Sequence, residues 1–466
     1  MKKYLKKVMG VGLAIVCTIC SLTINPVTAK ASDFWPEGPA VESASAIVME
    51  ASTGTILYEK NSRDMHYPAS ITKIMTTLLA LENGNLSDVV TFSDDAIDKT
   101  EGSGIFRDYG EQMTLEQCLY AVMLNSANEC AYAVAEHVGG TIENFVNMMN
   151  TKAAELGCQN THFNNPHGLH DDNHYTCAYD MALIAKAAWQ NETFRIITGT
   201  PRYTIPPTNK HVEQTDLQNH NEMLYPFRTN KYVYDYCVGG KTGYTQMANS
   251  TLVTYAQKDG MTLICVVMDV KSPGQWNDTR ALFDYCFDNF QLLNVADNET
   301  RLENGEMNTG VLNTTEDFVK IDETGSIVIP KTASFNDTVA TVEKGSEDSE
   351  VAGVISYTYA DRVVGNANIV MTNATIEPFR FSNETVNDTS VEGTEADSDQ
   401  EKTFRINFRS ILRVILIIAG IGILILVILF LIAKFRIWQR KLSFQKRPKS
   451  PYKTIKQTKR KRRRRR

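Results

Sequence analysis

Residues 67–81, YPASITKIMTTLLAL, predict a helix that begins near Pro68 and carries an apolar run into the core. Pro68 suits the first turn of a helix because its φ is fixed and it has no N–H to satisfy. Residues three apart share a helix face, so the Lys73 amine can reach the Ser70 hydroxyl. A serine hydroxyl becomes a good nucleophile when a base takes its proton, and a lysine with a lowered pKa can be that base.

The S-x-x-K spacing alone also fits an ordinary helix N-terminus with an exposed lysine. It recurs at Ser443 and Ser450, in a basic tail with no apolar helix behind it. Two further motifs follow Ser70 in the chain. Ser126-Ala127-Asn128 lies between two predicted helices and offers a hydroxyl and an amide, while Lys241-Thr242-Gly243 lies on a predicted strand whose glycine lets a ligand approach the backbone. The ordered set of three motifs is far more specific than any one of them.

The chain around these motifs predicts an α+β fold. Residues 45–50 and 55–58 predict a β-hairpin, as do residues 251–255 and 261–268, of which the second strand is apolar enough to be central. Residues 114–117 form a capping box before one amphipathic helix, and further helices are predicted from the apolar periodicity. Together these elements predict helices packed on an antiparallel sheet.

Both ends of the chain carry membrane signals. Residues 1–31 combine lysines, an apolar stretch and a small-x-small site, which is typical of a secretory signal peptide. Residues 414–433 hold no charge and can cross a bilayer as one helix. The basic tail at 434–466 then stays in the cytoplasm by the positive-inside rule and places the rest of the chain outside the cell membrane. Nucleic-acid binding by the tail is the weaker alternative, and the acidic exported part also disfavours polyanions.

Between the two ends we expect a catalytic domain at 32–295, a small β-sandwich domain at 300–380 and a disordered stalk at 381–405. The β-sandwich is predicted from short β-rich runs separated by turn residues, and the stalk from a polar, acidic composition. Seven cysteines follow the signal peptide, and their odd number and apolar surroundings favour buried free thiols over a disulfide framework.

The motifs and their flanks resemble the low-molecular-weight penicillin-binding proteins that are D-alanyl-D-alanine carboxypeptidases, in the β-lactamase/DD-peptidase superfamily. The resemblance covers residues 44–290 and extends more loosely over 303–378. Beyond the three motifs, two further segments of this chain resemble the family: Asn165-Pro166-His167-Gly168-Leu169 and Tyr179-Asp180-Met181-Ala182. Two positions depart from the family pattern: Glu129 follows the S-x-N motif, and His170 follows His-Gly-Leu.

The resemblance implies a serine peptidase that removes the terminal D-alanine from peptidoglycan stem peptides through an acyl-enzyme, is acylated by β-lactam antibiotics and needs no cofactor or metal. Ser70 is then the nucleophile, Lys73 the general base and Ser126 the proton relay. By the same resemblance, the remaining motif residues bind the substrate. Asn128 holds Lys73 and a substrate amide, Lys241 and Thr242 bind the terminal carboxylate, and Gly243 belongs to the same motif. The backbone N–H groups of Tyr244 and Ser70 stabilise the oxyanion.

Four alternatives remain. A β-lactam sensor or a DD-endopeptidase shares all three motifs, so only turnover separates them from a carboxypeptidase. A class A β-lactamase carries a glutamate in the loop after S-x-N, and residues 161–176 contain none. The same segment gives metal-like spacings that would suit a zinc peptidase; these residues are His162, His167, His170, Asp171, Asp172 and His174.

Overall fold

The computed structural model describes residues 34–301, 319–344 and 351–371. The predicted signal peptide, stalk, membrane span and basic tail lie outside the described residues. Within the described ranges, no helix is both long enough and apolar enough to cross a membrane.

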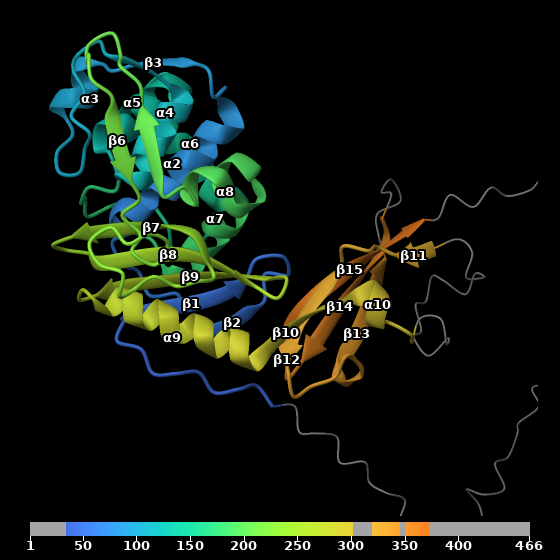
Figure 1. Ribbon diagram of the computed structural model, residues 1–466. Helices are drawn as coiled ribbons and strands as arrows, with labels where there is room; N and C mark the ends of the chain where they lie inside the picture. The colour runs from blue at the N-terminus through green and yellow to red at the C-terminus, as the bar shows by residue number, and fades with distance from the viewer. Residues whose placement is uncertain (1–33, 302–318, 345–350, 372–466) are drawn as a thin grey trace, which may run out of the picture. The chain divides into compact units, whose positions relative to one another are not determined.

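The centre of the catalytic region is a five-stranded antiparallel sheet with the strand order β2-β1-β9-β8-β7 (Figure 1). β9 lies between β1 and β8, which confirms the central position that its apolar run predicts. β7, which carries the Lys-Thr-Gly motif, is an edge strand paired with β8 alone. The bounds of these strands are β1 Ser45–Glu50, β2 Ile56–Lys60, β7 Cys237–Thr245, β8 Asn249–Lys258 and β9 Met261–Val270.

Helices cover both faces of this sheet, as Figure 1 shows. Successive strand residues point to opposite faces, so Ile47 and Met49 join the larger hydrophobic core beneath α2 and α7, while Ala46 and Val48 join a second core beneath α9. Two buried faces explain why β9 is apolar and buried without interruption from Leu263 to Met268. The sheet is therefore the middle layer of three.

The helices confirm the amphipathic pattern of the sequence, and several shorter ones add to it. Thr114 caps α4 in the predicted capping box with Gln117. The stretch at 67–81 forms a short 3-10 turn, η1 (Ala69–Thr72), that leads directly into α2. The helix bounds are α2 Lys73–Asn83, α3 Asp94–Asp98, α4 Leu115–Leu124, α5 Asn128–Gly139, α6 Ile142–Glu155, α7 Ala178–Gln190, α8 Glu192–Thr198, α9 Gly274–Asn289 and α10 Val295–Asn298.

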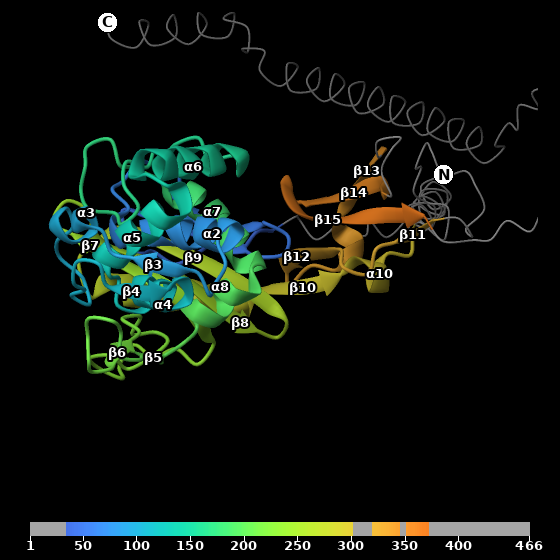
Figure 2. The ribbon, with the colours of Figure 1, turned by 90° about the horizontal axis from the view of Figure 1, so that it is seen from above.

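Two small hairpins that the sequence pattern did not predict flank the helical layer. β3 (Val89–Thr91) pairs with β4 (Gln112–Thr114), and β5 (Arg202–Ile205) pairs with β6 (Thr215–Gln218). The second hairpin lies beside α4, as Figure 2 shows. Each strand is three or four residues long, which is too short for alternation to give a clear signal.

The β-rich region after the catalytic domain forms an antiparallel sheet with the order β10-β12-β15-β14-β13, and β11 pairs with β15. Its strands surround their own hydrophobic core, which includes Ile327, Ile355 and Tyr357. In the described residues all six strands belong to one hydrogen-bonded sheet, so the second sheet of a sandwich is not seen there. The bounds are β10 Phe290–Asn294, β11 Val319–Ile321, β12 Ser326–Pro330, β13 Val339–Lys344, β14 Val351–Tyr359 and β15 Arg362–Met371, with a 3-10 turn, η2, at Phe335–Asp337.

Candidate active site

Ser70 and Lys73 meet at the start of α2, as their spacing predicts. Ser70 lies in η1, and Lys73 is the first residue of α2. The Lys73 amine donates a hydrogen bond to the Ser70 hydroxyl at 3.2 Å. Ala69, immediately before Ser70, has a φ of +51°, which is uncommon for a residue with a side chain. Such strain is often found at functional sites, where the surrounding structure holds the backbone in place.

Lys73 is buried, and no carboxylate among the residues that the structure describes forms an ion pair with it. Its amine donates to the Asn128 side-chain oxygen at 2.7 Å and to the His167 carbonyl at 2.6 Å. Burial lowers the pKa of Lys73 well below its ordinary value, and the nearby charge of Lys241 lowers it further. Both causes favour the neutral amine. Lys73 can therefore accept a proton from Ser70.

Ser126 lies in the turn between α4 and α5 with a φ of +60°. Its hydroxyl oxygen is buried and has no hydrogen-bond partner among the described residues. Ser126 and Ser70 line the same cleft. A buried hydroxyl that lacks a partner is costly unless a ligand completes its hydrogen bonding, so Ser126 is available to a bound substrate.

β7 runs directly past Ser70. Gly243 is essential to this approach, because a Cβ at that position would lie 2.9 Å from the Ser70 nitrogen and 2.3 Å from the Thr251 hydroxyl. Thr251, on β8, donates to the Pro68 carbonyl at 2.8 Å and so ties the sheet to η1. The Lys-Thr-Gly motif therefore needs its glycine for close packing against the Ser70 turn.

The other site residues predicted on β7 are Lys241, Thr242 and Tyr244. Two of them line the cleft and one is buried behind it. Thr242 and Tyr244 line the cleft, and Tyr244 is 66% exposed. Lys241 is only 1% exposed, and its amine donates to the Thr242 carbonyl at 2.9 Å. Burial lowers the pKa of Lys241 to about 7. Lys241 thus lies behind the cleft wall, where its charge acts on Lys73.

The cleft itself has a volume of about 470 Å³ and combines predicted with unpredicted residues. The unpredicted ones come from the loop between β6 and β7, from the loop before β4, from β8, and from the start of α9 with the residues just before it. No short motif marks them, because only the folded sheet brings them to Ser70. The lining residues are Ser70, Ser103, Ser126, His220, Glu222, Phe227, Arg228, Thr242, Gly243, Tyr244, Ser250, Thr251, Ser272, Gln275 and Trp276.

Comparison with known proteins agrees with this geometry. The sequence profile of the D-alanyl-D-alanine carboxypeptidase family matches residues 32–272. The D-alanyl-D-alanine carboxypeptidase DacF of Bacillus subtilis is 34% identical over 324 residues, which are 66% of this chain and 80% of that protein. The chain belongs to the D-alanyl-D-alanine carboxypeptidase family.

Further relatives and solved structures support this family assignment. The carboxypeptidase DacC of Escherichia coli is 29% identical over 71% of this chain and 83% of its own length. The crystal structure of the Streptomyces K15 DD-transpeptidase superposes with a TM-score of 0.51 and 30% identity, over 54% of this chain and 100% of that one. The D-alanyl-D-alanine carboxypeptidase of Mycobacterium tuberculosis has a TM-score of 0.50 at 30% identity, over 54% of this chain and 94% of that one.

Glu129, one of the departures from the usual family pattern, has a clear structural role. Its carboxylate accepts hydrogen bonds from the backbone N–H groups of Ile105 and Phe106, at 2.6 and 2.8 Å. Asn128, next to it, donates to the Glu101 carbonyl and holds Lys73. Glu129 thus fixes the loop that borders the catalytic motif.

The histidine-rich segment supports the same site in this member of the family. His174 accepts a hydrogen bond from the Asn164 N–H at Nδ1, and its Nε2 lies 2.8 Å from the Thr72 hydroxyl. Burial lowers the pKa of His174 and of His167 to about 3, so both rings are neutral. These hydrogen bonds occupy both ring nitrogens of His174. The ring therefore has no free lone pair with which to bind the zinc ion that the spacing suggested.

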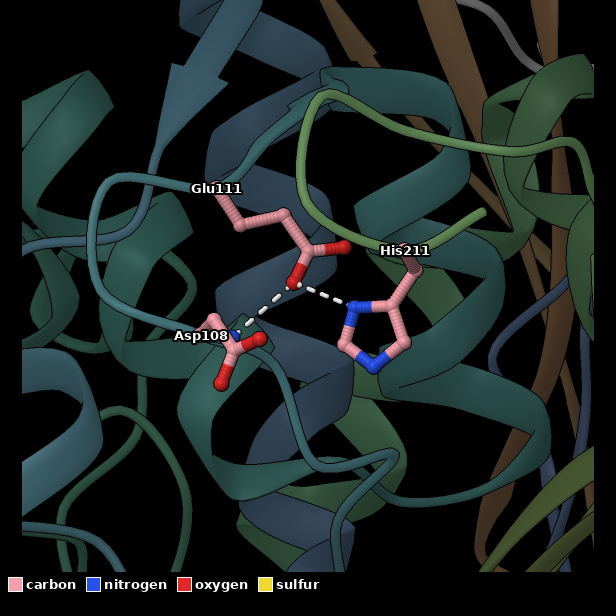
Figure 3. Close-up of side chains that lie close together, drawn as sticks. All are labelled: Asp108, Glu111 and His211. Carbon is pink, nitrogen blue, oxygen red and sulfur yellow. Dashed lines mark hydrogen bonds and ion pairs between the residues drawn. The ribbon is translucent and has the colours of Figure 1, made fainter. Parts of the chain in front are cut away.

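One other group has the composition of a metal site. The ligand atoms of Asp108, Glu111 and His211 lie within 4.8 Å of one another (Figure 3). Glu111 already pairs with Arg107 at 2.9 Å and accepts from the Asp108 N–H and from His211. The carboxylate is therefore the centre of a buried ion-pair network that joins the 107–111 loop to the 208–211 loop.

Proposed function

We propose that this protein is a serine-type D-alanyl-D-alanine carboxypeptidase that removes the terminal D-alanine from peptidoglycan stem peptides. The observation that carries the proposal is the contact of Ser70 with a buried lysine whose pKa is lowered and which forms no ion pair with a carboxylate in the described part of the chain. Family membership supplies the substrate class, and the geometry of the cleft is consistent with it.

The first half of the reaction forms an acyl-enzyme. Neutral Lys73 takes the Ser70 proton, and the Ser70 oxygen attacks the carbonyl carbon between the two D-alanines. The backbone N–H groups of Ser70 and Tyr244 stabilise the oxyanion, where each donor is typically worth about 3 kcal/mol. The C–N bond then breaks as Ser126 gives its proton to the leaving amine and regains one from Lys73.

The second half frees the enzyme by hydrolysis. Lys73 takes a proton from water, the resulting hydroxide attacks the ester carbon, and the proton returns to Ser70 as the C–O bond breaks. Asn128 holds Lys73 and a substrate amide, and Thr242 and Gly243 of β7 bind the substrate beside the nucleophile, with the buried Lys241 amine behind them. Penicillins acylate the same serine because they enter the same cleft.

The site lies, in this proposal, outside the cell. The signal peptide at 1–31 exports the chain, and the apolar segment at 414–433 anchors it in the membrane with the basic tail in the cytoplasm. The β-rich domain is proposed to be a small β-sandwich, since its strands already surround a shared apolar core. Along the chain, this domain lies between the catalytic region and the stalk.

The test is D-alanine release from a stem peptide ending in D-Ala-D-Ala, measured with the full-length chain and with Ser70→Ala. Release by the wild type alone establishes the carboxypeptidase. If neither protein releases D-alanine although penicillin still binds the wild type covalently, the protein is a sensor or a DD-endopeptidase, and cleavage of cross-linked peptides separates these two.

A further inference from the structure

The loop between β6 and β7, residues 219–236, forms a wall of the cleft that contains Ser70. It contributes His220, Glu222, Phe227 and Arg228 to the lining. None of these residues belongs to the three motifs that identify the family. The loop therefore adds chemistry to the cleft that the three motifs do not supply.

Arg228 is the permanent cation among the cleft-lining residues that the structure describes. Lys241 is buried behind the wall and donates to the Thr242 carbonyl. Burial, together with the charges of Lys241 and Arg228, lowers the pKa of His220 to about 4, so its ring is neutral. No carboxylate in the described part of the chain forms an ion pair with Arg228, although Glu222 lines the same cleft.

The loop that carries this arginine is anchored at two points, while the Arg228 side chain itself is exposed and lies over the Phe227 ring, 5.5 Å from its centroid. At the base of the loop, Arg280 of α9 donates to the carbonyls of Tyr232 and Val233 at 3.1 and 2.6 Å. Nearer the tip, the Phe227 ring packs on the His220 ring with a centroid separation of 4.4 Å. Arg228 directly follows Phe227, so this packing positions the backbone from which the Arg228 side chain reaches the cleft lining.

We propose that Arg228 binds the terminal carboxylate of the peptide substrate and thereby selects free C-terminal ends. A guanidinium can bind a carboxylate through two parallel hydrogen bonds, and its charge persists at every working pH. Thr242 lines the same cleft and supplies a hydroxyl to the same group. Lys241 then acts through its field on Lys73, without contact with the substrate. This inference rests on the proposed function.

The experiment compares two acyl donors on the full-length chain. One is a stem peptide ending in D-Ala-D-Ala with a free carboxylate, and the other is the same acyl-D-alanine as a p-nitrophenyl ester, whose leaving group carries no carboxylate. We expect Arg228→Gln to lower kcat/KM for the peptide about 10- to 100-fold and to leave kcat/KM for the ester unchanged. Arg228→Lys should recover part of the loss.

Lys231 provides the matched control, since it is an exposed cation on the same loop that packs on Tyr232 and does not line the cleft. Lys231→Gln should leave both rates unchanged. An equal loss of both rates in Arg228→Gln, or a loss of neither, overturns the proposal for Arg228, while Ser70-dependent release by the wild type still supports the carboxypeptidase. Absence of D-alanine release by the wild type instead contradicts the proposed function and with it this inference.

Discussion

Lys73 shows how a single residue acquires chemistry from its surroundings. Its amine is buried against an amide oxygen, a carbonyl and the Ser70 hydroxyl, none of which carries a charge. Each unit by which the pKa falls corresponds to about 1.4 kcal/mol of preference for the neutral form. Burying a protonated lysine here is costly, so the fold itself produces the free base that the reaction needs.

Lys241 offers a test of this electrostatic account. Its charge lowers the pKa of Lys73, so replacing it by methionine should raise that pKa. The acid limb of the pH profile of kcat/KM reports the deprotonation of the base in the free enzyme. In Lys241→Met this limb should therefore move to higher pH. The profile is best measured with the p-nitrophenyl ester, and an unchanged acid limb would show that Lys241 does not tune Lys73.

At the residue scale, the sequence predicts which motif residues form the site. It does not predict the contacts of each side chain or the other residues that line the cleft. Helical periodicity predicts that Ser70 lies next to Lys73. The S-x-N and Lys-Thr-Gly motifs add Ser126, Asn128 and residues 241–243 to the predicted site. Sequence spacing cannot show that the Lys241 amine is directed to the Thr242 carbonyl, since this depends on the packing around β7. Arg228 and Gln275 were missed because long-range folding alone brings their loop and helix to the cleft.

Among the elements, β7 is the one whose position decides activity. Gly243→Ala places a Cβ against the Ser70 turn and forces the strand away, a misfit that typically costs about 1–3 kcal/mol of stability. A displacement of the order of 1 Å at a catalytic site can reduce the rate about 100-fold. We therefore expect kcat/KM for D-alanine release to fall about 100-fold, with a smaller change in the free energy of unfolding.

The control for this variant is Gly260→Ala in the turn between β8 and β9. Gly260 has a φ of +78°, and a Cβ there would meet no atom within 4 Å. The substitution costs backbone strain of about 1 kcal/mol without moving β7. Activity should stay close to that of the wild type in Gly260→Ala. If both variants lose activity equally, general destabilisation explains the result and the close approach of β7 does not.

The ion-pair network around Glu111 should make two loops acid-sensitive. Burial alone raises the pKa of Glu111, but hydrogen bonds from Asp108 and Thr208 and the charge of Arg107 outweigh it and hold the pKa below its ordinary value of 4.5. A carboxylate with a depressed pKa stabilises the fold above its unfolded-state pKa, and this contribution is lost as the pH falls through the folded-state value. The stabilisation is thus complete at neutral pH.

Glu111→Gln removes the charge that faces buried Arg107, so it should lower the free energy of unfolding by about 3 kcal/mol at pH 7. The difference from the wild type should shrink as the pH falls from 4.5 through the lower folded-state pKa, because Glu111 becomes protonated first in the unfolded and then in the folded wild type. Urea denaturation at several pH values measures this difference in the free energy of unfolding.

Asp95→Asn is the control. It changes the exposed pair with Lys99 and should alter the free energy of unfolding by less than about 1 kcal/mol. A pH-independent difference for Glu111→Gln would contradict the account.

Longer elements were predicted more successfully than shorter ones. The helices and the strands β8 and β9 have enough residues for periodicity or apolar runs to reveal them. The hairpins β3–β4 and β5–β6 gave no such signal. β10 continues directly from α9 and pairs with β12, so the second sheet already includes residues 290–294. Pairing of this kind depends on a partner more than thirty residues away and leaves no local trace in the sequence.

For the molecule as a whole, the cysteines test the prediction that packing and not cross-links stabilises the folded domains. All seven described cysteines are free thiols, as expected, and six of them are buried. Burial raises the pKa of Cys158 to about 12 and that of Cys177 to about 11, which disfavours the reactive thiolate.

We expect a reductant to leave the Tm unchanged. The native protein should react slowly with thiol reagents, whereas the denatured chain without residues 1–31 should present seven thiols. Fewer thiols after denaturation, together with a Tm that falls in reductant, would reveal disulfides and contradict this prediction.

The central claim is that catalysis passes through an acyl group on Ser70, and trapping that group tests it most directly. The full-length chain is incubated with penicillin and digested, and the modified peptide is located by mass spectrometry, with Ser70→Ala treated in parallel. The account predicts one adduct, on Ser70, and none in the variant. An adduct on a different residue, or D-alanine release that persists in Ser70→Ala, would contradict it.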